Sequence, residues 1–166
     1  MPALETGVRA PEIELSLTDG SGFSLMEARM LGSVVLAFFK VGCPVCQFTF
    51  PYLERIYKSY SPSGAFAMVG ISQDNQADTE AFMQRCGITF PVALDPADKY
   101  PASNAYGITN VPSIFLVSDE CEIGESIVSW SKADMDRLNR TLAELCGMPP
   151  AEIFPANEDV PEFKIG

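Results

Sequence analysis

The stretch VVLAFFKVGCPVCQFTFPYL, residues 34–53, places two cysteines at the junction between an apolar run and a helical pattern. The apolar run, residues 34–39, is typical of a strand that is buried on both faces because helices cover the sheet on both sides. From Pro44 onward, apolar residues recur three, four and seven positions apart, which is the spacing of one face of a helix. The stretch therefore predicts an α/β fold with a Cys-x-x-Cys pair between a central strand and the following helix.

The position of the two cysteines predicts thiol chemistry. Proline favours the first turn of a helix, so Pro44 places Cys43 at or near the N-cap. The helix dipole and the unpaired amides stabilise a thiolate there, and cysteines in such motifs have pKa values of roughly 3.5–7.5. Cys46 follows one turn later on the same side and is expected to be the more buried of the two. We therefore expect Cys43 to attack a disulfide and Cys46 to resolve the mixed disulfide.

Two other interpretations of the pair remain at this point. A zinc site needs two further ligands, but Cys86, Cys121 and Cys146 are each isolated in the sequence and there is no histidine, so no metal site is predicted. A purely structural pair is the second alternative. The absence of histidine also excludes Cys-His and Ser-His nucleophile pairs. We expect Cys121 to lie in an exposed turn and assign no chemistry to the other two cysteines.

The rest of the chain alternates between strand and helix patterns. Strands are predicted at residues 12–17, 66–72, 90–95 and 111–118, with a hairpin partner at 122–130; helices are predicted at 75–87 and 131–147, and a turn or helix at 99–107. This order predicts one α/β sandwich with helices on both sides of the sheet. We place the domain at residues 1–147.

Residues 148–166 form a tail with four prolines, which excludes a helix. Its apolar residues Ile153, Phe154, Phe163 and Ile165 predict that it packs on or near the domain.

Charge and hydropathy restrict the partners and the location. Eleven basic residues against 22 acidic ones give a net charge of −11, which disfavours nucleic acid as a partner. The longest apolar run is too short to span a bilayer, so no membrane insertion is expected. No signal-peptide pattern is present, which predicts a cytoplasmic protein as given, or an extracytoplasmic one if an export signal was removed.

Three segments resemble the thioredoxin superfamily. FFKVGCPVCQFTFPYL resembles its active-site segment, with Pro51 eight residues after the first cysteine, and NVPSIFLV resembles its cis-proline loop, which would make the bond between Val111 and Pro112 cis. The segments GVRAPEIELSLTDGSGFSL and GISQDNQADTEAFMQRCGITFPVALDP resemble the redoxin branch. That branch includes the alkyl hydroperoxide reductase/thiol-specific antioxidant proteins and the TlpA- and ResA-type oxidoreductases. The likeness covers roughly residues 5–147.

This resemblance implies a thioredoxin-like three-layer sandwich with a mixed central sheet. It implies a thiol:disulfide oxidoreductase that acts on protein disulfides or dithiols, exchanges electrons with a redox donor or acceptor protein, and needs no cofactor beyond a Cys43–Cys46 disulfide. Cys43 and Cys46 would be catalytic, while Val111, Pro112, Gly42 and Pro44 would bind substrate. Neither the direction of electron flow nor the oligomeric state follows from the resemblance.

The sequence departs from the family patterns in two respects. A peroxiredoxin places Pro-x-x-x-Thr-x-x-Cys around its reactive cysteine, but neither Cys43 nor Cys46 has this threonine and proline. This departure argues against activation of a peroxide bond. A thiol peroxidase is therefore the less favoured alternative function, and a non-catalytic binding module is the other. Ala37 and Thr49 also stand where thioredoxins and ResA-like proteins, respectively, carry a carboxylate.

Overall fold

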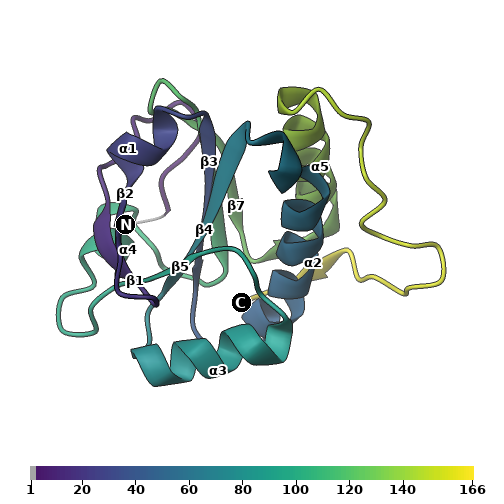
Figure 1. Cartoon of the computed structure of the whole chain (residues 1–166). Helices are drawn as coiled ribbons and strands as arrows, with labels where there is room; N and C mark the ends of the chain where they lie inside the picture. Colours follow the sequence, from purple (N-terminus) through teal and green to yellow (C-terminus); the bar gives the residue numbers. More distant parts are fainter. Residues whose placement is uncertain (1–2) are drawn as a thin grey trace.

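The computed structural model describes residues 3–166. Its main sheet has seven strands, and helices pack against both faces of it (Figure 1). The strands are β1 (Glu14–Leu17), β2 (Gly22–Ser24), β3 (Ser33–Phe39), β4 (Phe66–Ser72), β5 (Val92–Leu94), β6 (Ser113–Val117) and β7 (Ile123–Val128). The helices are α1 (Leu25–Arg29), α2 (Pro44–Tyr60), α3 (Gln76–Cys86), α4 (Pro101–Ala105) and α5 (Lys132–Leu145), with a 3₁₀ turn at Ser61–Ser63.

The sheet is mixed, in the order β2-β1-β5-β4-β3-β6-β7. Strands β3, β4 and β5 are parallel to one another, whereas β6 and β7 on one side and β1 and β2 on the other pair antiparallel. The predicted three-layer α/β architecture with a mixed sheet is confirmed.

Strand β3 lies inside the sheet, between β4 and β6, and it explains the long apolar run. Successive side chains point to opposite faces of a strand. Phe38 accordingly packs with Tyr106 and Phe115 on one face, and Phe39 packs with Phe50 and Phe82 on the other.

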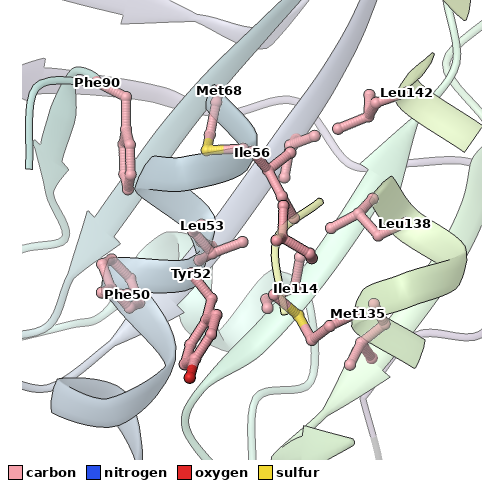
Figure 2. Packing of buried hydrophobic residues seen from close by; sticks show 14 of the residues in the cluster. Phe50, Tyr52, Leu53, Ile56, Met68, Phe90, Ile114, Met135, Leu138 and Leu142 are labelled. Carbon is pink, nitrogen blue, oxygen red and sulfur yellow. The ribbon is translucent and has the colours of Figure 1, made fainter. Parts of the chain in front are cut away.

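The larger of the two cores lies between the sheet and helices α2, α3 and α5. Leu53 and Ile56 of α2 lie in one buried cluster with Leu138 and Leu142 of α5 (Figure 2). Burying a side chain of this kind contributes roughly 1.5–3 kcal/mol. This packing fixes the position of α2, and therefore of the cysteine pair at its start.

Some features of the fold differ from what the sequence suggested. Strand β2 and helix α1 were not predicted, because three and five residues are too few to show a periodicity. Cys121 is buried rather than exposed, at 7% relative accessibility, and its sulfur lies 3.9 Å from the carbonyl oxygen of Ala10. The N-terminal segment covers this turn, and that contact is invisible in the local sequence.

The proline-rich tail, residues 148–166, runs past α2 and α5 and returns toward the start of α2 (yellow in Figure 1). Ile153 and Val160 are buried in the larger core, and the Trp130 indole N–H donates to the carbonyl of Pro161 at 2.7 Å. The tail ends in β9 (Phe163–Lys164), which pairs antiparallel with β8 (Trp130–Ser131). Within the described residues, no helix combines the length and the apolar character needed to cross a bilayer.

Candidate active site

Cys43 occupies the N-cap of α2. Its backbone is extended (φ −85°, ψ 115°), and Pro44 is the first residue of the helix, as predicted. The Cys46 N–H donates to the Cys43 sulfur at 3.3 Å. A sulfur that carries negative charge is stabilised by such a donor and by the positive end of the helix dipole. The turn therefore presents a partly exposed sulfur that accepts a backbone N–H at the start of a helix.

Cys46 lies on the inner side of the same turn. Its side chain is fully buried, whereas that of Cys43 is half-buried, which agrees with the order expected from the sequence. Burial raises the pKa of the Cys46 thiol far above its ordinary value; the Lys40 backbone opposes part of this, and the adjacent Cys43 and the charge of Asp74 raise it further. Cys46 is thus a protonated thiol that is shielded from solvent and lies beside the accessible sulfur.

The loop before β6 closes one side of the site. The peptide bond between Val111 and Pro112 is cis, as the resemblance implied. The Cys43 sulfur lies 3.5 Å from the Val111 carbonyl oxygen, although the two residues are 68 positions apart in the sequence. Gly42 and Pro44 are exposed on either side of Cys43. The structure therefore gathers all the residues that the sequence nominated around one sulfur.

Asp74 is a member of the site that the sequence analysis missed. Its carboxylate accepts a hydrogen bond from the Val41 N–H at 2.8 Å, and the Val41 carbonyl accepts one from the Gln47 side chain at 2.9 Å. These contacts hold the loop that leads into Cys43. A signal for Asp74 was present, because it follows β4, the parallel neighbour of β3, and the carboxyl ends of parallel strands meet at one edge of a sheet.

The two positions where a carboxylate was expected carry none. Ala37 is buried in β3, and the Thr49 hydroxyl, also buried, donates to the Val45 carbonyl at 2.7 Å. Neither side chain can accept the proton of Cys46.

The remaining cysteines lie away from this turn. Cys86 ends α3, Cys121 is buried beside the N-terminal segment, and Cys146 follows α5 with its sulfur 4.0 Å from the Tyr60 carbonyl oxygen. Among residues 3–166, no three His, Cys, Asp or Glu side chains come close enough together to hold a metal ion.

Comparison with known families identifies the family of this chain. Residues 6–126 match the model of the AhpC/TSA family. The chain belongs to the AhpC/TSA family. This match includes the strand, the cysteine pair and the cis-proline loop described above, and it confirms the redoxin resemblance.

Similar proteins indicate the activity class. The chain is 30% identical over 134 residues to the thiol-disulfide oxidoreductase ResA of Geobacillus thermodenitrificans, covering 80% of this chain and 75% of that protein. It superposes with a TM-score of 0.75 and 26% identity on a putative thiol:disulfide interchange protein DsbE from Chlorobium tepidum, covering 87% of this chain and 99% of the other.

A peroxidoxin, BcpB from Mycobacterium tuberculosis, shares the fold at a TM-score of 0.70 and 20% identity, covering 88% of this chain and 99% of that one. The fold is therefore common to both kinds of enzyme. The family and the ResA and DsbE relatives confirm the predicted class, a thiol:disulfide oxidoreductase.

Proposed function

We propose that this protein exchanges disulfide bonds with polypeptide partners through Cys43 and Cys46, with Cys43 as the attacking sulfur and Cys46 as the resolving one. The observation that carries this assignment is the contrast between the two sulfurs. Cys43 is accessible and accepts the Cys46 N–H, whereas Cys46 is buried and protonated directly behind it. Only the first can meet a sulfur of another protein.

The reaction has two exchange steps. The Cys43 thiolate attacks one sulfur of the substrate disulfide, a mixed disulfide forms, and the released substrate sulfur takes a proton from solvent. Cys46 then loses its proton and attacks the Cys43 sulfur, so that the Cys43–Cys46 disulfide forms and the second substrate sulfur leaves as a thiol. The substrate gains two electrons, and a dithiol partner must reduce the Cys43–Cys46 disulfide before the next cycle. Oxidation of a substrate dithiol is the same sequence in reverse.

The second step is the demanding one. Burial holds Cys46 in its protonated form, and neither Ala37 nor Thr49 offers a carboxylate to remove the proton. Resolution of the mixed disulfide is therefore expected to limit turnover and to accelerate as the pH rises.

Reduction of insulin disulfides by the dithiol-charged protein tests the assignment. Cys43→Ser should abolish the activity because a hydroxyl is a far weaker nucleophile than a thiolate. Cys46→Ser should instead accumulate a mixed disulfide between Cys43 and the substrate, visible as a mass increase that reductant reverses. Cys86→Ser is the matched control and should retain full activity.

Two outcomes would contradict the assignment: an active Cys43→Ser variant, or a Cys46→Ser variant that turns over normally without a trapped adduct. Consumption of hydrogen peroxide by wild-type protein at a rate exceeding insulin reduction would point to the peroxidase alternative.

A further inference from the structure

The end of the tail lies at the active site. The carbonyl oxygen of Gly166 accepts a hydrogen bond from the Asn110 side chain at 2.7 Å, and its N–H donates to the Ser129 hydroxyl at 3.1 Å. A methyl group added at Gly166 would collide with the backbone carbonyl of Val111. That carbonyl is the one that lies 3.5 Å from the Cys43 sulfur. The last residues of the chain therefore lie directly beside the cysteine that meets substrate.

The tail consists of a firmly held part and a loosely held part. Residues up to Pro161 are anchored by the buried side chains of Ile153 and Val160 and by the indole of Trp130. Beyond them, β9 pairs only with the two-residue strand β8. The side chains of Phe163 and Ile165 are 73% and 89% exposed. An anchored base with a weakly packed end can release that end without unfolding the domain.

Several contacts direct this end across the start of α2. The Lys164 ammonium lies 5.1 Å above the ring of Phe48, two residues after Cys46. Ser129, which accepts the Gly166 N–H, has a left-handed backbone (φ 66°), and its own N–H donates to the Pro112 carbonyl at 2.9 Å. Strained backbone of this kind concentrates at functional sites. Hydrogen bonds of Ser129 thus connect the cis-proline loop to the end of the tail.

We propose that residues 163–166, here called the tip, occupy the position that a polypeptide substrate needs beside Val111, so that the tip selects substrates by size. This inference rests on the proposed function of Cys43. Because the Cys43 sulfur lies 3.5 Å from the Val111 carbonyl oxygen, a polypeptide bonded to that sulfur comes against Val111, where Gly166 now lies, and has to displace the tip. A small disulfide needs only the Cys43 sulfur and can react while the tip stays in place.

Two variants test this proposal, one lacking residues 163–166 and one carrying Gly166→Ala. The first removes the tip, and the second keeps the chain length but forces the tip away from the Val111 carbonyl. Both should raise the rate of exchange with insulin by roughly three- to tenfold, the factor that corresponds to one or two lost hydrogen bonds. Exchange with glutathione disulfide should change less than twofold, by roughly the scatter of a neutral substitution. Asn157→Ala, in an exposed turn of the anchored part, is the matched control and should change neither rate.

A second measurement separates this proposal from the function on which it rests. Alkylation of Cys43 by a bulky maleimide should accelerate in both tip variants, whereas alkylation by iodoacetamide should hardly change. An insulin rate that stays the same or falls in both variants, while wild-type protein is active, would overturn the role of the tip. If wild-type protein shows no exchange with either disulfide but the bulky reagent still reacts faster with both tip variants than with wild type, the proposed function fails and the occupancy of the site by the tip stands.

Discussion

The cysteine turn and the proline-rich tail meet at Val111, yet they are built in opposite ways. Within the turn, Cys43 and Cys46 are three residues apart and their contact follows from the first turn of a helix. In the tail, the Tyr52 hydroxyl donates to Glu158 across 106 residues, and the Ala151 N–H donates to the Tyr60 hydroxyl across 91. A turn assembled from local contacts can keep its geometry while its surroundings vary, whereas a segment held by distant contacts depends on the whole fold.

The largest effect is expected from a substitution that removes a buried side chain of the tail. Ile153 is 2% exposed and packs in the core between α2 and α5. Ile153→Ala should lower the free energy of unfolding by roughly 2–4 kcal/mol, because the lost methyl groups leave a cavity. Urea denaturation measures this loss, and the activity of the folded fraction should remain because the cysteine turn keeps its own contacts.

Ile165→Ala is the control for this experiment, since Ile165 is 89% exposed and should change the stability by less than roughly 0.5 kcal/mol. If the two substitutions changed the free energy of unfolding equally, the buried part of the tail would contribute nothing to the stability of the core.

The same contrast explains which parts of the molecule could be predicted. The strand that carries the apolar run and the helix that begins at Pro44 depend on periodicity and on helix-start preferences, which act over a few residues. The cysteine pair and the cis-proline loop have specific local patterns. Helix α1 also had a local signal that was overlooked, because Ser24 is followed three residues later by Glu27, the sequence pattern of a capping box, and the Glu27 N–H donates to the Ser24 hydroxyl.

What the sequence could not supply is contact between distant segments. Cys121 looked exposed beside two glutamates, but the chain around Ala10 covers it. Composition predicted that the tail would pack against the domain, but nothing local indicated that Gly166 would reach Val111. Asp74 could be predicted in part. Its position after a parallel strand indicates the correct edge of the sheet, but nothing local indicates the hydrogen bond that it accepts from the Val41 N–H.

A substitution at Asp74 tests whether the chemistry of the cysteine turn depends on a neighbouring segment of the fold. Its charge adds to the effect of burial in raising the pKa of Cys46. Asp74→Asn keeps an oxygen that can accept the Val41 N–H but removes the charge, so the pKa of Cys46 should fall. More thiolate is then present at any pH below that pKa, and the mixed disulfide at Cys43 should resolve faster, by roughly two- to fivefold for one partly screened charge.

Single-turnover decay of the mixed disulfide, followed from neutral to alkaline pH, measures this effect. The difference from wild type should shrink as salt is added. Asp98→Asn, which removes an exposed charge away from the turn, is the control. If Asp74→Asn decays like wild type at low salt, the turn is electrostatically independent of β4 and its loop.

The smallest effect is expected at the ion pair on the outside of the tail. Arg55 donates to the Glu158 carboxylate at 2.9 Å, and this contact lowers the pKa of Glu158 below its ordinary value of 4.5; the Tyr52 hydroxyl contributes in the same direction. Because the pKa is lower in the folded state, the carboxylate stabilises the fold above pH 4.5, and this stabilisation is lost as the pH falls through the folded value. Exposed pairs contribute little, since water and salt screen them.

Glu158→Gln should therefore lower the melting temperature slightly at pH 7, and the difference from wild type should vanish in acid. Glu152→Gln, on an exposed tail residue that forms no ion pair within residues 3–166, is the control. A difference that persists at low pH would mean that the glutamate holds the tail through packing and not through its charge. The tail would then be anchored by packing and not by charge, and this pair would give the tip at Val111 no dependence on pH.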